Sequence, residues 1–272
     1  MTGQRRSFAG ATVVISGAGG GLGRALARRF AQAGARIVGL DHDAAAIQSL
    51  AAELTQAGAD SLALSCDVTD QDACRAAIDA ACERFGRIDV VVNNAGLSHR
   101  SPFADTDPAV LRRVMDVNLF GAIHLTHPAL PALRRSRGLI VAISSVAGFT
   151  PLLARTGYAA SKHALHGLFE SLRTEVAADG IDVLLACPSF IATRIDRNAL
   201  GAQGGAASHP QVVVGQPLQP DDVASRIFKA CERSERLVLI GRTARAAWWL
   251  SRCAPALYER IMARRLRDEM MP

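Results

Sequence analysis

Residues 11–30 read ATVVISGAGGGLGRALARRF, and this stretch decides the fold. A short apolar run at 11–16 enters a glycine-rich segment, and an alanine- and arginine-rich amphipathic segment follows at 22–33. A strand, a tight glycine turn and a helix in this order are typical of the first unit of a parallel sheet that helices cover. We therefore expect strands and helices to alternate along the rest of the chain.

The remaining sequence alternates in this way. Near-continuous apolar runs predict buried parallel strands at 11–16, 35–41, 61–67, 88–94, 138–144, 181–188 and 236–241. Amphipathic segments predict helices near 22–33, 43–57, 70–85, 107–133, 156–179 and 220–233. The sequence thus predicts an α/β fold with one doubly wound parallel sheet of about seven strands and helices on both of its faces.

The glycine turn itself suggests a phosphate ligand. Gly17, Gly21 and Gly23 fall between the first strand and the first helix. Glycine there allows a tight turn, a close approach of the backbone to a pyrophosphate, and close packing of helix on strand. The helix N-terminus adds free amides and a positive dipole end. A tight turn without a ligand has the same pattern, so the prediction of a dinucleotide depends on further residues.

Asp41 at the end of the second predicted strand is such a residue. A carboxylate at this point accepts hydrogen bonds from the ribose hydroxyls of an adenine dinucleotide and repels a 2′-phosphate. Neither lysine nor arginine lies at 16–23 or 42–43 to attract that phosphate. The sequence therefore favours NAD over NADP. As an alternative, Asp41 caps the following helix, although Asp43 is equally suited to that purpose.

Composition places the chain among reduced, soluble proteins. No apolar run approaches the ~18 residues of a membrane span, and no apolar N-terminal stretch precedes a cleavage site. The six cysteines form no CxxC pair, which favours the cytoplasm and argues against a zinc or disulfide scaffold. The net charge of +6 is concentrated in the tail, and no basic stripe interleaved with aromatic residues runs along the chain, so we expect no nucleic-acid partner and no metal.

In these residues the chain resembles the short-chain dehydrogenase/reductase family, over about residues 8–241. The family's TGxxxGxG motif is present at 16–23 with serine for threonine, NNAG at 93–96, and YxxxK at 158–162. The resemblance implies a Rossmann-type fold and a cofactor site that comprises Ser16, Gly17, Gly21, Leu22, Gly23, Asp41, Asp67, Val68, Asn94, Ala95, Gly96, Tyr158, Lys162, Pro188 and Thr193. It implies the catalytic residues Asn118, Ser145, Tyr158 and Lys162. Ser145 lies thirteen residues before Tyr158, as the family requires, and Ser144 is the lesser candidate.

The Tyr158–Lys162 pair is also unusual for this composition. The chain has two tyrosines, Tyr158 and Tyr258, and two lysines, Lys162 and Lys229. A phenol with a pKa near ~10 needs a nearby cation to act as a base at neutral pH, and a lysine one helical turn away supplies it. We expect Tyr158 to move the proton and Lys162 to lower its pKa and hold the cofactor ribose. An ordinary surface pair at helical spacing is the alternative.

We expect the serine and asparagine near this motif to assist proton transfer, and the histidines to have packing or surface roles. Ser145 should orient the substrate oxygen, and Asn118 should hold a water that links Lys162 to solvent. His99, His124, His127, His163 and His166 are interpreted as packing or surface residues, and His99 has the best position to contribute to the site. The sequence departs from the family at Ser189, where PGxxxT has its glycine, and we expect this change to alter the local loop conformation.

One domain is expected at 1–242, with a substrate loop at 189–219, and a basic amphipathic tail at 243–272 that is not a domain of its own. The loop and the segment 97–104 contain Phe103, Phe190, Ile191, Ile195 and Leu200 but few charges, which favours a lipophilic, steroid-like or other hydrophobic alcohol. The tail has two open interpretations: a helix packed on the body or on a second subunit, or an element on a membrane surface. The expected protein is cytoplasmic, a homodimer or homotetramer, with membrane association left open.

These observations predict an NAD-dependent oxidoreductase that interconverts a secondary alcohol and a ketone. Two alternatives stay open at this point. One is an NADP-preferring carbonyl reductase of the same fold. The other is a non-catalytic regulatory protein that binds a dinucleotide, against which the complete set Asn118, Ser145, Tyr158 and Lys162 argues, because a sensor needs no proton relay.

Overall fold

A computed structural model describes residues 5–193, 195, 198–207, 212–265 and 267 of the chain. The remaining parts of the predicted domain, of the loop 189–219 and of the tail 243–272 lie outside the described residues: 1–4, 194, 196–197, 208–211, 266 and 268–272.

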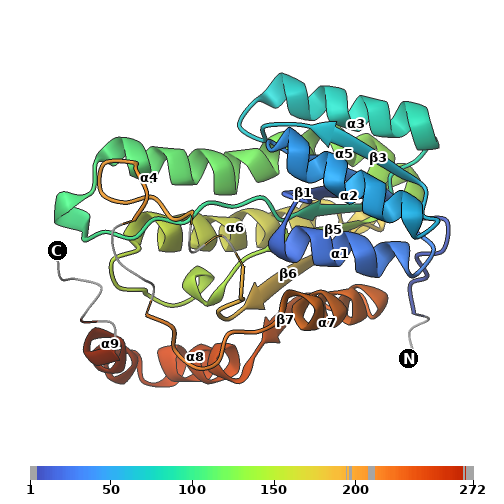
Figure 1. Cartoon of the computed structure of the whole chain (residues 1–272). Coiled ribbons are helices and arrows are strands. Elements are labelled where there is room, and N and C mark those ends of the chain that lie inside the picture. The colour runs from blue at the N-terminus through green and yellow to red at the C-terminus, as the bar shows by residue number, and fades with distance from the viewer. Residues whose placement is uncertain (1–4, 194, 196–197, 208–211, 266, 268–272) are drawn as a thin grey trace.

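The described residues form one seven-stranded parallel sheet in the order β3-β2-β1-β4-β5-β6-β7 (Figure 1). Its strands are β1 Thr12–Ser16, β2 Arg36–Asp41, β3 Ser61–Ser65, β4 Val90–Asn93, β5 Leu139–Ile143, β6 Asp182–Pro188 and β7 Leu237–Ile240. Every residue of β1 and β5 is buried, as expected for central strands covered on both faces. The predicted doubly wound α/β fold is confirmed.

Helices cover the two faces of the sheet in separate layers. One layer contains α1 (Gly21–Ala31), α2 (Ala44–Gln56) and α7 (Pro220–Glu232), and its core holds Phe8, Phe30 and Phe228 in mutual ring contact at 5.0–5.2 Å. The other layer contains α3 (Gln71–Phe85), α5 (Gly121–Ser136) and α6 (Thr156–Glu175), packed around Phe169 and Leu125. The loops that follow the strands lie at the carboxyl edge of the sheet, which is where ligands bind in folds of this kind.

The helix predicted at 107–133 differs from the observed one. α4 (Pro108–Met115) is followed by a π-helical turn at Asp116–Phe120, and α5 then extends to Ser136. A π turn adds one residue to the ladder of backbone hydrogen bonds, and hydrophobic spacing does not reveal such an insertion. The turn contains Asn118, and π turns often lie at functional sites because they reorient one side chain.

Two helices form the C-terminal tail. Gly241 links β7 to α8 (Arg242–Cys253) with a φ of 100°, and α9 (Pro255–Arg265) follows directly. Short 3-10 turns complete the described elements: η1 Phe103–Asp105, η3 Val146–Gly148 and η4 Ala177–Asp179. Within the described ranges, none of the helices has the length and apolar character needed to span a bilayer.

Candidate active site

The glycine turn between β1 and α1 requires glycine at several positions for steric reasons. A Cβ on Gly23 would lie 2.0 Å from the carbonyl oxygen of Gly17, so any side chain there forces the turn apart. Gly17 and Gly21 have φ values of 63° and 52°, in the left-handed region that favours glycine. No described side chain caps α1, whose N-cap is Gly20, so its first amides face the turn. Leu22, the remaining predicted residue of the motif, is buried in the core.

Ser16 and Asn94 connect this turn to the end of β4. The Ser16 hydroxyl accepts hydrogen bonds from the amides of Asn94 and Ala95, each at 3.0 Å. The Asn94 side-chain amide donates to the carbonyls of Ser16 at 2.9 Å and Gly17 at 3.1 Å. A serine hydroxyl therefore provides the contacts at the position where the family has threonine. Gly96, the last predicted residue of this segment, has the Asn118 and Lys162 side chains as neighbours.

Asp41 also contacts the glycine turn directly. Its carboxylate accepts from the amide of Gly19 at 2.9 Å and from the amide of Asp43 at 3.0 Å. The N-cap of α2 is Asp43, whose side chain accepts from Ala46, so helix capping is not the role of Asp41. The carboxylate thus lies where β2 meets the glycine turn, in the position predicted to face a ribose.

Asp67 and Val68 follow β3 at the same edge of the sheet. The Asp67 carboxylate accepts from the backbone amide of Thr69 at 2.9 Å and from its hydroxyl at 2.8 Å, which fixes the carboxylate in a turn. Val68 is 7% exposed and packs against Gly121, where a Cβ would lie 2.6 Å from a Val68 methyl group. Asp67 is therefore held in a turn after β3, and Val68 is packed against the start of α5.

Asn118 is placed by the π turn with its side chain inside the protein. Its Oδ1 accepts from the Leu97 amide at 2.7 Å, and its Nδ2 donates to the Leu97 carbonyl at 2.9 Å and to the Ser161 hydroxyl at 2.8 Å. Both amide protons are used in these bonds, so the side chain has only a lone pair of Oδ1 left for a water. Its geometry makes Asn118 a brace between the segment after β4 and α6.

Lys162 lies in the first turns of α6 with its side chain fully enclosed. It is 3% exposed, and Nζ donates to the carbonyl of Ile143 at 2.9 Å. Nζ is 5.7 Å from the centroid of the Tyr158 ring. Burial disfavours the ammonium and lowers the pKa of Lys162 to about 8. The two rare residues of the YxxxK motif are therefore together on the inner side of α6, and a surface pair is excluded.

The two serines after β5 have different surroundings. Ser145 is half-buried, and its hydroxyl accepts from the amide of Ala147 at 3.2 Å, as the cap of η3. Ser144 is 3% exposed, and its hydroxyl lies 3.1 Å from Nε2 of His166 and 3.4 Å from the carbonyl of Lys162. Ser144 is therefore part of a buried contact beneath α6, which supports Ser145 as the serine that faces the site.

Pro188 and Thr193 follow β6 and approach the glycine turn from the other side. Pro188 is the last residue of β6. Thr193 is so close to Gly21 that a Cβ on that glycine would lie 3.1 Å from the threonine methyl group. Ser189 keeps strand-like pairing with Ile240, and its hydroxyl occupies the space that a Cβ at Gly241 would need, 2.6 Å away. Gly241 thus accommodates the serine that replaces the family's glycine.

The segment 97–104, which we expect to shape the substrate pocket, carries buried polar groups. His99 is fully buried, and neither ring nitrogen has a hydrogen-bond partner among the described residues. Burial, together with the charge of Arg155, lowers the pKa of His99 to about 4, so the ring is neutral. His99 contacts Gly157, which precedes Tyr158. The histidine that we singled out from its position is therefore beside the motif.

Arg100 and Arg155 were not recognised from the sequence. They are 6% and 4% exposed, and Arg100 lies in the segment 97–104, where we expected few charges. Because the chain is rich in arginine, its composition gives no sign that these two arginines are buried. The Arg100 amide bonds to Leu200, and Ser101 bonds to Ala154, so this segment is held between the loop 189–219 and the start of α6.

The other expected pocket residues and histidines are dispersed. Phe103 is 67% exposed, whereas Ile191 is packed against the core. His163 and His124 contact backbone carbonyls, and His166 contacts Ser144 and the Cys187 thiol. No group of three potential metal ligands occurs in the described part of the chain.

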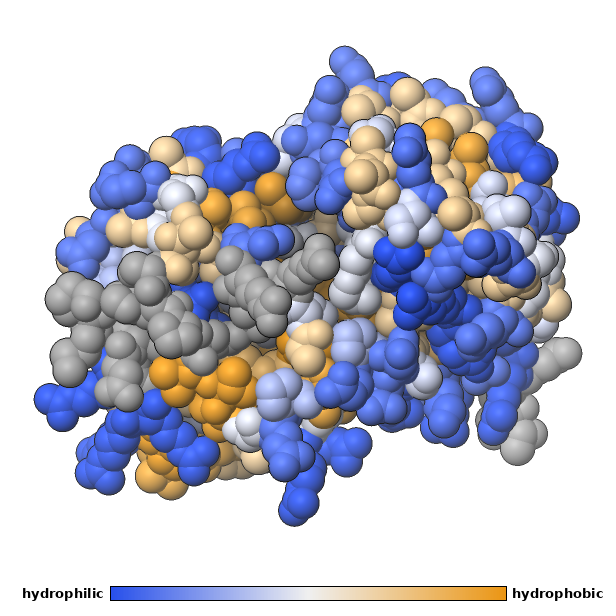
Figure 2. Space-filling model, in the orientation of Figure 1, coloured by the Kyte–Doolittle hydropathy of each residue, from blue (hydrophilic) through white to orange (hydrophobic). Residues whose placement is uncertain are grey.

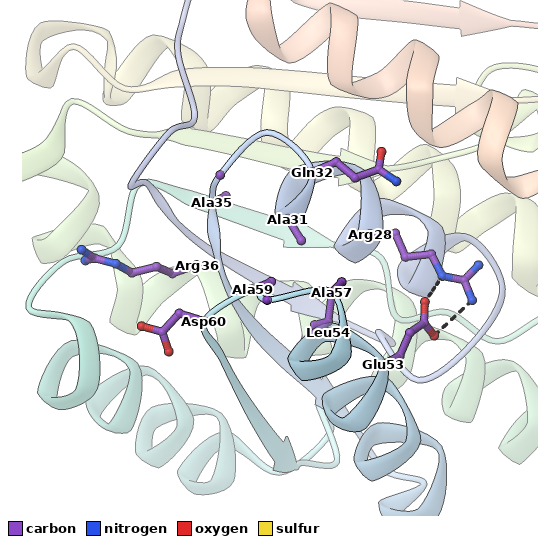
Figure 3. A pocket seen from close by; sticks show the side chains of 12 residues that line it. Arg28, Ala31, Gln32, Ala35, Arg36, Glu53, Leu54, Ala57, Ala59 and Asp60 are labelled. Atoms are coloured by element: carbon purple, nitrogen blue, oxygen red, sulfur yellow. Dashed lines mark hydrogen bonds and ion pairs between the residues drawn. The ribbon is translucent and has the colours of Figure 1, made fainter.

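A cavity of about 450 Å³ lies at the opposite edge of the sheet, where β2 and β3 begin (Figure 3). Arg36 and Asp60 line it, and Arg28 and Glu53 form an ion pair across it. The residues of the predicted site are at the carboxyl ends of the strands, so this cavity is not the catalytic pocket.

The described residues fit a dinucleotide cofactor. The start of α1 has no side-chain cap, and the glycines before it leave its backbone free of side chains, so its amides can bind phosphates. The Asp41 carboxylate at the end of β2 can accept hydrogen bonds from ribose hydroxyls. Residues of this kind were predicted from sequence, and the structure brings them together along one edge of the sheet.

Comparisons with known proteins agree with this geometry. Residues 11–203 match the short chain dehydrogenase family. The Bos taurus protein "Dehydrogenase/reductase SDR family member 7B" is 39% identical over 267 residues, which cover 95% of this chain and 82% of that protein. The Anopheles gambiae "Dehydrogenase/reductase SDR family protein 7-like" is 37% identical and covers 96% of this chain and 84% of its own.

A solved structure is similar over almost the whole chain. The crystal structure of a short chain dehydrogenase/reductase SDR from Burkholderia phymatum in complex with NAD has a TM-score of 0.83 and 27% identity, and the match covers 93% of this chain and 96% of that one. With the seven-stranded sheet, the glycine turn and the matched residues 11–203, the chain belongs to the short-chain dehydrogenase/reductase family of oxidoreductases.

Proposed function

We propose that this protein is an NAD(H)-dependent oxidoreductase that interconverts a secondary alcohol and a ketone, with Tyr158 as the acid/base. The observation that carries the proposal is the enclosed Lys162, whose Nζ is anchored on the Ile143 carbonyl and lies 5.7 Å from the Tyr158 ring centroid. A buried cation beside a phenol has a clear chemical use in proton transfer.

The residues divide the work as follows. When bound, the nicotinamide ring supplies or accepts the hydride. Tyr158 takes the hydroxyl proton during oxidation and returns it during reduction, and the Lys162 ammonium favours the phenolate. Ser145 donates to the substrate oxygen and fixes it near Tyr158, which is useful because a preformed dipole does not reorganise during reaction. Asn118 braces Leu97 against Ser161, which keeps α6 and the substrate segment in register. A water held at Asn118 that links Lys162 to solvent remains part of the proposal.

Asp41 supports NAD as the preferred cofactor. Its carboxylate is held at the glycine turn by the Gly19 amide, and a 2′-phosphate at this point would face a negative charge. Arg24 directly follows the glycine motif, but its guanidinium donates to Glu53 at 2.8 Å and to Ser49 at 3.0 Å and is therefore already engaged. An NADP-preferring carbonyl reductase is the alternative that a cofactor comparison distinguishes.

A lipophilic secondary alcohol, steroid-like or otherwise hydrophobic, remains our proposed substrate class. Apolar residues of 97–104 and of the described parts of 189–219 support it, and the buried His99 supplies one polar partner for a substrate oxygen. We also propose a cytoplasmic homodimer or homotetramer, which light scattering after gel filtration tests directly.

Replacement of Tyr158 by phenylalanine tests the mechanism. The variant should still bind NADH, while turnover falls about 10²–10⁴-fold, the range expected for loss of an acid/base group. Tyr258→Phe is the matched control, because the second tyrosine of the chain is 5% exposed and lies on α9, and it should keep near-native turnover. The assay is absorbance at 340 nm over a panel of alcohols and ketones with NAD and NADP in parallel.

Near-native turnover by Tyr158→Phe would overturn the acid/base role. Binding of NADH by the parent protein without turnover of any panel member would favour the regulatory alternative. Higher kcat/KM with NADP than with NAD would overturn the cofactor preference while leaving the mechanism intact.

A further inference from the structure

The helices α8 and α9 each bury one face on the body and expose the other. On α8, Ala244 and Ala247 are buried, and Trp249 on the opposite side is 68% exposed. On α9, Tyr258 is buried and Leu257 is 49% exposed. We define the outer face as the exposed side chains on the same sides of α8 and α9 as Trp249 and Leu257: Arg242, Arg245, Trp249, Leu257, Arg260 and Arg264.

The inner faces of both helices pack on the same short segment. The Trp248 ring lies 4.8 Å from the Phe149 ring, and the Arg252 guanidinium lies over the Trp248 ring at 3.2 Å and 5.8 Å from the Phe149 ring. The Tyr258 hydroxyl is hydrogen bonded to the side chain of Thr150. Because both helices are anchored at residues 149–150, their outer faces point away from the same part of the body, and Figure 1 shows α8 and α9 along one border of the molecule.

The outer face has a strong and uncompensated positive charge. Between 242 and 265 there are six arginines, and Glu259 is the only acid. Several surface arginines elsewhere pair with acids, as Arg84 does with Asp60 and Arg134 with Asp179. The structure, over the ranges that it describes, shows no ion pair for the four arginines of the outer face.

We propose that the outer face binds the anionic surface of a lipid bilayer. Figure 2 shows hydrophobic residues flanked by hydrophilic ones over the region that Figure 1 assigns to α8 and α9. Tryptophan and leucine at the centre of such a face enter the interface between headgroups and acyl chains, while arginines around them are attracted to anionic lipids. The helices then lie on the membrane and do not cross it.

Charge favours this occupant over a second copy of the chain. In a symmetric dimer a face meets its own equivalent, so the arginines of the outer face would oppose one another. A nucleic acid would attract the arginines, but it offers no apolar layer for the exposed Leu257. A bilayer with anionic lipids matches both the charge and the apolar side chains.

The orientation has a consequence for the active site. Phe149 directly follows η3, the turn capped by Ser145, and it is the residue on which α8 rests. A membrane bound at the outer face would therefore lie on the same side of the molecule as residues 145–150, against which α8 packs. The proposal does not depend on the substrate class or on Tyr158, because its readout is binding of vesicles.

Co-sedimentation with vesicles tests the proposal on the full-length protein. Sucrose-loaded vesicles of phosphatidylcholine alone, and of phosphatidylcholine mixed with phosphatidylglycerol, are compared at low and high salt. We expect binding to the mixed vesicles only, weakened by salt because exposed charges are screened. Arg245→Glu with Arg260→Glu should lower the partition coefficient at least tenfold, and Trp249→Ser with Leu257→Ser should lower it about fivefold.

A matched pair of substitutions controls for net charge. Arg75→Glu with Arg112→Glu changes the charge by the same amount at exposed positions of α3 and α4, outside the outer face, and should leave vesicle binding unchanged. Circular dichroism and turnover with a soluble substrate confirm that each variant is folded.

Several results would overturn the proposal. Equal binding to vesicles with and without phosphatidylglycerol would remove the electrostatic argument, and equal losses in the outer-face and control variants would reduce it to net charge. A change of oligomeric state in the outer-face variants, without any binding of vesicles by the parent protein, would identify a subunit interface. Salt-sensitive binding of duplex DNA without binding of vesicles would identify a nucleic-acid surface.

Discussion

Two regions at the carboxyl edge of the sheet are held together in different ways. In the first, the motif region (residues 16–23, 41, 93–96, 145 and 158–162), side chains bond to backbone, as Asn94 does to Ser16 and Gly17 and Lys162 to Ile143. In the second, which we propose contacts the substrate and call the substrate region (residues 97–107 and the described parts of 189–219), the two segments are joined by backbone bonds, as Arg100 is to Leu200 and Asp107 to Ala202, with local side-chain bonds such as that between Ser101 and Thr106.

The difference explains why only one region has a recognisable sequence. A side chain that bonds to a particular carbonyl must be of a particular type, so the motif region requires specific residues at fixed spacing. Backbone pairing accepts almost any residue, so side chains of the substrate region are free to determine specificity. Substitutions in each region test this contrast.

The two serines after β5 should differ sharply. Ser145→Ala removes the hydroxyl proposed to orient the substrate oxygen, and kcat/KM should fall about 100-fold with little change in stability. Ser144→Ala removes the contact with His166, so it should lower the free energy of unfolding by about 1 kcal/mol and leave kcat/KM within about twofold. Steady-state kinetics and urea unfolding measure both effects. Equal kinetic losses in the two variants would contradict the assignment.

Gly23→Ala should damage the motif region as a unit. The new methyl group would lie 2.0 Å from the Gly17 carbonyl oxygen, so the turn must open, with a loss of about 1–3 kcal/mol of stability and a weakening of NADH binding of at least about tenfold. Gly20→Ala is the control, because its backbone is extended and no atom lies within 4 Å of the new Cβ. Fluorescence titration with NADH compares them, and similar affinities for both variants would show that the turn tolerates side chains.

His99→Leu tests the substrate region. Leucine fills a similar space without polar atoms, so stability should be unchanged or higher, because the ring nitrogens of His99 lack partners among the described residues. If His99 donates to the substrate, KM should rise about tenfold with little change in kcat. An unchanged KM would show that the histidine only fills space.

Protonation of Lys162 should give a modest pH dependence. Burial lowers the pKa of this lysine to about 8, and the ammonium is a stronger, charge-assisted donor to the cofactor ribose than the neutral amine, so NADH affinity should be full below about pH 8 and fall severalfold as the pH rises through it. Stability should move in the opposite direction: the unfolded chain keeps its proton up to about 10.5, so the free protein gains stability between about 8 and 10.5. In Lys162→Met both dependences should disappear. Fluorescence titrations and thermal unfolding across this range provide the measurement.

Much of the motif region was predictable from the sequence, and the substrate region was not. The spacing of Tyr158 and Lys162 placed both on one side of a helix, and the glycine pattern predicted the turn. The role of Ser144 was not accessible, since the sequence alone shows neither its burial nor its contact with His166, twenty-two residues away. The burial of Arg100 and Arg155, and the pairing of residues 98–101 with Leu200 and Ala154, join segments that no periodicity connects.

The order of strands and helices, the glycine turn and the Tyr158–Lys162 pair could be read from the sequence, because these features depend on residues close together in the chain. The tertiary structure alone showed that Ser144 is buried against His166, how Gly241 accommodates Ser189, and that the tail folds into α8 and α9 with Trp249 and Leu257 exposed. These features arise from contacts between distant segments, whose geometry is set by packing of the whole chain.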